Sequence, residues 1–286
     1  MPRPRRFGIC TDQNMSWETT VERWQYFEQL GFDSIWDCDH YTQPSRPQGP
    51  YFEGWSLLAG LAARTTRIRI GCLVTCNTFR HPALVAKMAV TVDHISNGRL
   101  ELGLGAGWYV PEHTAYGIPF PEPPQLVGMF SEAVEVIDTL LRNEIVTYSG
   151  SHYQLQDAVF RPGPLQKPRP PFTIGGHRPR MLRIVAQYAD AWNSFGTVQE
   201  IRERNAILDE QCAAVGRDPA EIYRGLYGWA SMMQSDPFNS PAAFEDMVEA
   251  YSEAGINEFI IDQPRPDQFP VVERIAADVM PRLRNP

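Results

Sequence analysis

Apolar and polar positions alternate along the chain with two different periods. Short apolar runs, which are typical of buried strands, are separated by longer segments in which apolar residues recur every three or four positions, as on one face of a helix. The short runs predict strands at 7–11, 34–36, 68–74, 100–104, 173–174, 191–192, 223–229 and 259–261. The longer segments predict helices at 17–30, 55–64, 83–96, 126–142, 178–188, 200–215, 241–254 and 268–283. Eight strand–helix pairs in one chain predict an α/β fold, a closed (β/α)₈ TIM barrel rather than an open sheet.

Residues that start and stop helices lie at the ends of these segments. Ser16 offers an N-cap to the first helix, and Gly31 stands just beyond its end, where glycine is common. Pro82 suits the first turn of the third helix, and Asn97-Gly98 ends that helix. These local signals support the boundaries that the periodicity predicts.

The alternation lapses between residues 145 and 171. Thr147-Tyr148 and residues 152–154 flank Ser149-Gly150-Ser151, which predicts a small hairpin inserted after the fourth helix. The proline-rich stretch 162–171 resembles a linker, but the composition on its two sides is the same. We therefore predict a single (β/α)₈-barrel domain over residues 1–286.

Composition and charge exclude several classes of protein. Hydrophobic residues make up 43% and charged residues 21%, an ordinary globular balance. The net charge of -8 argues against general binding to nucleic acid or to an anionic membrane. No secretory signal or apolar run of membrane-spanning length is visible, so we expect a cytoplasmic protein that acts on a small molecule. The five cysteines are scattered without a C-x-x-C pair, which suits reduced thiols and predicts no metal site.

Polar and glycine residues follow four consecutive predicted strands. In a (β/α)₈ barrel the reactive groups come from the C-terminal ends of the strands, so these residues should face one mouth. In chain order they are Asp39 and His40, then Thr75 and Asn77, then Gly105, Gly107 and Trp108, and finally Gly175, Gly176 and His177.

His40 is the first candidate for acid–base chemistry. Imidazole titrates near neutral pH and can pass a proton to or from a substrate, while Asp39 could polarise it or bind the edge of a cofactor. The alternative is a loop histidine whose ring is satisfied by a backbone carbonyl. Position alone leaves both interpretations open.

The glycines after the fourth strand do not form a dinucleotide-binding motif. G-x-G-x-x-G starting at Gly103 would need glycine at position 108, which holds Trp108. These glycines either let the backbone approach a flat ring or a phosphate closely, or serve a turn with positive φ. From the glycines alone we expect the turn.

The string Gly175-Gly176-His177-Arg178 is a candidate anion site. It follows a strand and opens a helix, so free N–H groups and the positive end of the helix dipole point toward the mouth. Arg178 and Arg180 add charge that can pair with a phosphate. The alternative is a solvated turn with surface arginines, and we expect the phosphate.

Other catalytic motifs are incomplete or missing. Glu112-His113 does not complete the H-E-x-x-H motif of zinc proteases. The sequence has no G-x-S-x-G nucleophile elbow and no G-x-x-x-x-G-K-[ST] phosphate loop.

Several longer strings resemble one known family. Residues 31–40 (GFDSIWDCDH) resemble the second-strand region of luciferase-like monooxygenases and their deazaflavin-dependent relatives. Residues 71–82 (GCLVTCNTFRHP) resemble their third strand and the turn after it, and residues 100–116 resemble their fourth strand. Residues 174–177 and 188–193 match a later pair of segments. The resemblance covers residues 7–195 well and the remainder by length and pattern.

The resemblance implies an oxidoreductase that holds a tricyclic cofactor across strand exits two to four. Asp39 and His40 would face the reactive ring, with His40 as proton donor or base. Thr75 and Asn77 would hydrogen-bond the ring or the ribityl chain. The family often has a non-prolyl cis peptide in the third strand. The backbone that would support the ring there belongs to Cys72, Leu73 and Val74.

The resemblance also assigns the other side of the ring and the phosphate. The phosphate would be held by Gly175, Gly176 and His177. The far side of the ring would be lined by Gly105, Ala106, Gly107 and Trp108.

The resemblance favours coenzyme F-420 (F420), a 5-deazaflavin that carries hydride, with FMN as the alternative cofactor. Arg46, Arg80 and Arg178 would bind the acidic tail of F420. Trp108 stands where several deazaflavin dehydrogenases have a glutamate, which argues against a sugar-phosphate dehydrogenase. We therefore expect hydride transfer between F420 and a small organic substrate, with reduction of an activated C=C or C=N bond.

Two other functions stay open. An FMN-dependent luciferase-like monooxygenase would share this fold and most of these motifs, and so would a non-catalytic flavin-binding protein. Relatives are commonly dimers built on barrel helices, so the expected protein partner is a second copy of the chain.

Overall fold

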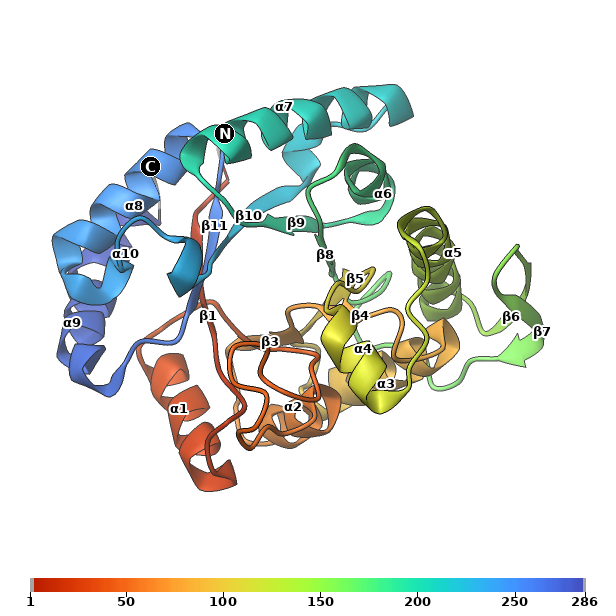
Figure 1. Ribbon diagram of the computed structural model, residues 1–286, viewed down its shortest axis with the longest axis horizontal. Coiled ribbons are helices and arrows are strands. Elements are labelled where there is room, and N and C mark those ends of the chain that lie inside the picture. The colour runs from red at the N-terminus through yellow and green to blue at the C-terminus, as the bar shows by residue number, and fades with distance from the viewer. Residues whose placement is uncertain (1–2, 285–286) are drawn as a thin grey trace.

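The computed structural model describes residues 3–284 and has the predicted barrel at its centre (Figure 1). The sheet consists of β1 (Arg6–Cys10), β2 (Ser34–Asp37), β3 (Arg69–Cys72), β4 (Thr75–Cys76), β5 (Leu100–Gly105), β8 (Phe172–Gly175), β9 (Ala191–Ser194), β10 (Tyr223–Gly228) and β11 (Glu258–Asp262). All pairings in this sheet are parallel, and β3 pairs with both β2 and β5, which closes the barrel. Strand β4 continues the third strand beyond a short break. The predicted (β/α)₈ class is confirmed.

Helices surround the strands (Figure 1). They are α1 (Trp17–Gln29), α2 (Gly54–Ala62), α3 (Pro82–Ile95), α4 (Val110–Tyr116), α5 (Pro123–Arg142), α6 (Pro179–Tyr188), α7 (Val198–Val215), α8 (Pro241–Glu253), α9 (Phe269–Arg274) and α10 (Met280–Leu283). A π-helical turn, Ile275–Val279, joins the last two. Among the helices of residues 3–284, none has the length and apolar character that crossing a bilayer requires.

The expected capping residues lie where they were placed. The Ser16 hydroxyl accepts the N–H of Thr19 at 3.2 Å, and Gly31 has a φ of +83° just beyond α1. Pro82 opens α3. The segment between β5 and α5, for which the periodicity predicts no helix, contains α4, which ends on Gly117 in the left-handed conformation.

The interior of the barrel is filled by a small number of large side chains. Cys10, Trp36 and Ile260 form a buried cluster that is separate from the larger core between strands and helices. The neighbouring strands make room for the Trp36 indole with glycine, since a Cβ on Gly71 would lie 2.4 Å from its ring. The alternation of strand side chains therefore produces an inner and an outer core.

Two further features lie outside the ring of strands. β6 (Ile145–Ser149) and β7 (Gln154–Val159) form the predicted antiparallel hairpin, which lies beside α5 at the edge of the molecule (Figure 1). The two ends of the chain lie side by side, and the N–H of Arg5 donates to the carbonyl of Arg284 at 2.9 Å.

Candidate active site

His40 and Glu112 meet at the C-terminal mouth of the barrel. His40 follows β2, and Glu112 lies on α4, the helix after β5. The Nδ1 atom of His40 lies 2.8 Å from the Oε2 atom of Glu112. A carboxylate at Nδ1 favours the neutral tautomer with its proton on Nδ1, which leaves Nε2 to accept a proton from a substrate. In the imidazolium, Nε2 can donate that proton back.

Glu112 is held firmly in place. Its side chain is fully buried, and its Oε1 atom accepts the backbone N–H groups of Tyr41 at 2.5 Å and Thr42 at 2.9 Å. Burial raises the pKa of Glu112, but the hydrogen bond and charge of His40 and the two backbone N–H groups outweigh it, so its pKa lies below the usual value. The carboxylate therefore stays ionised and fixes both the imidazole and the loop after β2.

Asp39 lies next to His40, but its carboxylate is bonded to protein partners. Arg80 donates to its two oxygens at 2.6 and 2.9 Å, and the N–H of Cys76 donates to Oδ2 at 2.7 Å. Arg80 also pairs with Glu53 at 2.5 Å and is largely buried. This corrects the expectation that Arg80 binds an acidic tail, because its guanidinium joins two carboxylates of the protein. That Asp39 faces a cofactor stays a prediction.

The third strand carries the expected non-prolyl cis peptide, between Leu73 and Val74. Thr75 and Asn77 follow it, and both already have protein partners. The Thr75 hydroxyl accepts the indole N–H of Trp55 at 3.2 Å, and the Asn77 amide donates to the Tyr153 hydroxyl at 3.4 Å. Their predicted contacts with a cofactor stay predictions, as does the role of the buried Cys72.

The glycines around β5 serve two different purposes. A Cβ on Gly103 would lie 1.9 Å from the carbonyl oxygen of Cys72, and one on Gly105 would lie 2.5 Å from Val74 Cγ2. These two glycines therefore permit a close approach of the third strand, which corrects the expectation of a turn. Gly107 does need a left-handed backbone, with a φ of +98°. Ala106 and Trp108 flank it, and Trp108 is 57% exposed.

The loop after β8 leads into an uncapped helix N-terminus. Gly175 ends β8, Gly176 has a φ of +155°, and no side chain caps α6, which starts at Pro179. His177 is half-buried, and burial together with the charges of Arg204 and Arg178 lowers its pKa. The loop 175–178 and the first turn of α6 together offer N–H groups, positive charge and an imidazole whose pKa is lowered, which suits a phosphate.

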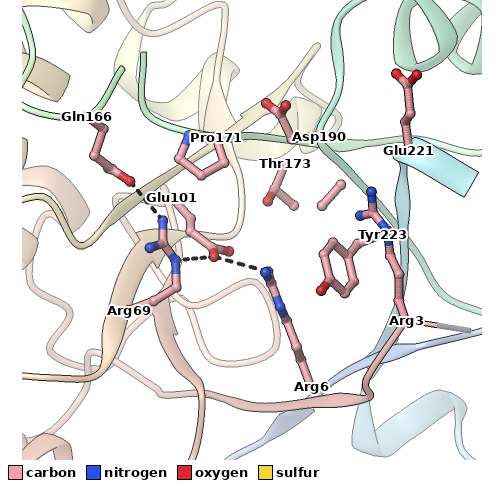
Figure 2. A pocket seen from close by; sticks show the side chains of 11 residues that line it. Arg3, Arg6, Arg69, Glu101, Gln166, Pro171, Thr173, Asp190, Glu221 and Tyr223 are labelled. Atoms are coloured by element: carbon pink, nitrogen blue, oxygen red, sulfur yellow. Dashed lines mark hydrogen bonds and ion pairs between the residues drawn. The ribbon is translucent and has the colours of Figure 1, made fainter. Parts of the chain in front are cut away.

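A polar hollow of about 270 Å³ lies at the opposite, N-terminal end of the barrel (Figure 2). Figure 2 shows the Glu101 carboxylate between the guanidinium groups of Arg6 and Arg69, and both arginines are bonded to it. Tyr223 forms part of the wall, with Arg6 over its ring at 3.7 Å. In (β/α)₈ barrels this end contributes to stability rather than catalysis. We therefore assign this cluster to closure of the barrel.

Glu112 is a site residue that the sequence alone does not predict. In the sequence Glu112-His113 is only an incomplete zinc motif, and the partner of Glu112, His40, lies 72 positions earlier. The signal that could have revealed it is local: Pro111 at the start of α4 and Gly117 at its end bracket a short helix that begins close to a strand exit.

The family to which these features belong follows from sequence comparison. A family model described as luciferase-like monooxygenase matches residues 4–265, which is most of the chain. The chain belongs to the luciferase-like monooxygenase family.

Relatives of this luciferase-like protein include F420-dependent enzymes. An F420-dependent glucose-6-phosphate dehydrogenase of Microbacterium testaceum (strain StLB037) is 34% identical over 227 residues, covering 78% of this chain and 67% of the relative. A phthiodiolone/phenolphthiodiolone dimycocerosates ketoreductase of Mycobacterium kansasii is 34% identical over 60% of this chain and 47% of that protein. In fold, an F420-dependent secondary alcohol dehydrogenase in complex with an F420-acetone adduct is similar at a TM-score of 0.85, with 20% identity and coverage of 99% and 100%.

Proposed function

We propose that the protein is an F420-dependent oxidoreductase that transfers a hydride between the deazaflavin and a small organic substrate. The observation that carries this proposal is the His40–Glu112 pair at the mouth of a luciferase-like barrel whose relatives are named as F420-dependent enzymes. Hydride transfer to a polar double bond must be matched by a proton, and His40 can supply it.

The residues at the mouth fit a phosphate-bearing flat cofactor. Val74 occupies the space that a Cβ on Gly105 would fill. The third strand and β5 therefore come close together at the Leu73-Val74 peptide. The uncapped N-terminus of α6, with Gly175, Gly176 and His177, would hold the phosphate. When bound, F420 would supply or accept the hydride.

The protein's own part of the reaction is proton transfer at His40 Nε2. Glu112 fixes the ring through Nδ1 and stabilises the imidazolium through its negative charge. In a reduction Nε2 would donate a proton to the substrate atom that gains electron density, and in an oxidation it would accept the proton of an alcohol.

The class of bond is a second part of the proposal. We expect an activated C=C or C=N bond because Trp108 stands where several deazaflavin dehydrogenases have a glutamate. The ketoreductase and the secondary alcohol dehydrogenase to which the chain is similar add the carbonyl and alcohol pair. In its oxidised form each of these substrates accepts a hydride at carbon and a proton at a neighbouring atom, and an alcohol loses both when it is oxidised. The same His40 chemistry serves each of them.

The His40→Ala variant tests the proton-transfer role. We expect turnover with F420 to fall by about 10²–10⁴-fold, the range for loss of a general acid or base. The dissociation constant of F420, followed by its own fluorescence, should change little. A variant that turns over as fast as the wild type while binding F420 would contradict the assignment. His152→Ala, in the exposed hairpin, is the matched control.

Three broader features belong to the same proposal. We propose that residues 1–286 form one barrel domain, that two copies associate as a homodimer, and that the enzyme works in the cytoplasm. The parallel sheet, closed by pairings between strands from both halves of the chain, supports the single domain. The dimer rests on the family resemblance, which implies association through barrel helices.

A further inference from the structure

Aromatic rings form a continuous line across the mouth of the barrel. The ring centroids lie 5.8 Å apart for His40 and Trp108, 6.4 Å for Trp108 and Trp229, 6.1 Å for Trp229 and Phe195, and 5.5 Å for Phe195 and His177. We call Trp108, Trp229 and Phe195 the aromatic arc. The arc connects the acid–base histidine with the loop assigned to the phosphate.

The arc is assembled from three separate strand exits. Trp108 follows β5, Phe195 follows β9 and Trp229 follows β10. Trp108 is 57% exposed, and the other two are partly exposed. Large aromatic side chains that remain accessible beside a reacting group indicate a ligand that covers them, because their burial against an apolar surface is favourable.

The tyrosines near the arc contribute rings rather than hydroxyl groups. The Tyr109 ring lies 6.0 Å from that of His40 and 5.1 Å from that of Trp108, while its hydroxyl donates to the carbonyl of Pro44 at 3.3 Å. Tyr227 stacks on Trp229 at 6.3 Å, and its hydroxyl donates to Asp262 at 2.5 Å. A ligand at the arc therefore meets apolar surface.

The charge near His40 is unsuited to an anionic substrate. Among residues 3–284 the His40 ring has one hydrogen-bond partner, the Glu112 carboxylate. Arg80 is engaged by Asp39 and Glu53, and the exposed Arg178 lies at the His177 end of the arc. A phosphate placed beside His40 would thus meet the negative charge of Glu112 and two aromatic rings, while Arg80 is already paired with carboxylates of the protein.

We propose that the substrate is an uncharged molecule whose apolar or aromatic body packs against Trp108 and Trp229 and presents a C=O, C=N or activated C=C bond to His40. This inference rests on the proposed hydride transfer and narrows its substrate class. In the reducing direction the substrate carbon would gain the hydride and the neighbouring atom would gain the Nε2 proton of the His40 imidazolium; reduced F420, when bound, would supply that hydride together with one proton. That last proton returns His40 to its starting state.

The proposal assigns Trp108 to the substrate, in place of the contact with the cofactor ring that the family resemblance implies, so Trp108→Ala is the diagnostic variant. Its matched control is Tyr116→Ala, which removes an aromatic ring of similar exposure, 55%, from α4 outside the arc. Calorimetric titration of the F420-loaded protein would compare acetophenone, cyclohexanone and a medium-chain ketone with glucose 6-phosphate. We expect the ketones to bind and glucose 6-phosphate to bind more weakly.

In Trp108→Ala, the dissociation constant of the best ketone should rise about tenfold, as for the loss of one good aromatic contact. The dissociation constant of F420 should stay within about twofold of wild type in Trp108→Ala. In Tyr116→Ala the dissociation constants of F420 and of the ketone should both stay within about twofold of wild type, a change smaller than the loss of such a contact would cause. The inference would be overturned if glucose 6-phosphate bound more tightly than every ketone, or if the ketone affinity were unchanged in Trp108→Ala. The proposed function would stand in either case, provided that the protein binds F420. Failure of the wild type to bind F420 would overturn both.

Discussion

At the scale of single residues, two histidines near the mouth differ in the state of their ring nitrogens. His113 is buried with both nitrogens in use, since Nε2 lies 2.6 Å from the Thr78 hydroxyl and Nδ1 lies 2.9 Å from the carbonyl of Tyr109. In His40 the Nδ1 atom is held by Glu112, and Nε2 has no hydrogen-bond partner among the described residues. His113 therefore has a structural role, whereas His40 keeps an Nε2 atom that can exchange a proton with a substrate.

The Glu112→Gln variant tests how His40 is positioned. The amide keeps the shape of the side chain but loses the charge that stabilises the imidazolium, so we expect kcat to fall about 10–100-fold, as for other partners that orient a histidine. Nitrogen NMR of His40 should show the proton on Nδ1 in the wild type and a mixture of tautomers in the variant. Equal kcat and an unchanged tautomer would contradict the role of Glu112.

The position of His40 was predictable because strand ends in a barrel converge on one mouth. Its partner was not, because the contact joins residues 72 positions apart and depends on the orientation of α4. Asp39 shows the same limit. Its place beside His40 is evident from the sequence, but its pairing with Arg80 requires two loops to meet.

At the scale of elements, the third strand and β5 are fitted to one another. The break after β3, with its cis peptide, brings Cys72 and Val74 against β5, and the residues opposite them are Gly103 and Gly105. A side chain at either glycine would collide with main chain or with Val74. The pairing of these strands therefore depends on the two glycines. The surface formed by the third strand and β5 is the one expected to support the cofactor ring.

The Gly103→Ala variant tests this fit. Because its Cβ would lie 1.9 Å from the carbonyl oxygen of Cys72, we expect the free energy of unfolding to fall by about 1–3 kcal/mol or more, as for overpacking of a core. Urea denaturation measures the change. Gly163→Ala is the control, since that Cβ would be 4.0 Å from the nearest atom, Lys167 Nζ, in an exposed loop. Equal stability of the two variants would refute the close approach.

The elements themselves were largely predictable, because strand and helix periods differ and the caps mark their ends. The exceptions have a common cause. The α4 helix is short and its apolar pattern covers too few turns to show a period, and the purpose of Gly103 depends on a neighbour that the local sequence does not specify.

At the scale of the whole molecule, the two ends of the barrel carry different polar groups. The mouth holds the His40–Glu112 pair and the aromatic arc. The N-terminal end holds the arginine and glutamate cluster of Figure 2, and Glu258, the first residue of β11, lies beside Arg6 of this cluster. Both oxygens of Glu258 are buried without a hydrogen bond, and Arg6 lies 3.7 Å away. Burial and the nearby Glu101 raise the pKa of Glu258 to about 8 despite that arginine.

The raised pKa of Glu258 predicts a pH-dependent stability. The folded state holds this proton up to about pH 8, whereas the unfolded chain releases it near the usual pKa of 4.5. The folded state thus binds more protons in that window, and stability should fall as the pH rises through it. In Glu258→Gln this loss of stability should disappear, so the stability of the variant relative to the wild type should increase as the pH rises toward 8. Thermal unfolding from pH 5 to 9 measures it, with Glu210→Gln on the exposed side of α7 as control. If the unfolding temperatures of wild type and Glu258→Gln changed with pH in parallel, the predicted role of Glu258 would be ruled out.

The most direct test of the account is the choice of cofactor. Apo-protein would be titrated side by side with F420 and with FMN, and binding followed by the fluorescence of each. The account predicts saturable binding of F420, weaker or no binding of FMN, and loss of F420 fluorescence change when a bulky residue replaces Gly176 in the phosphate loop. Tight binding of FMN with none of F420 would contradict it and favour the FMN-dependent monooxygenase.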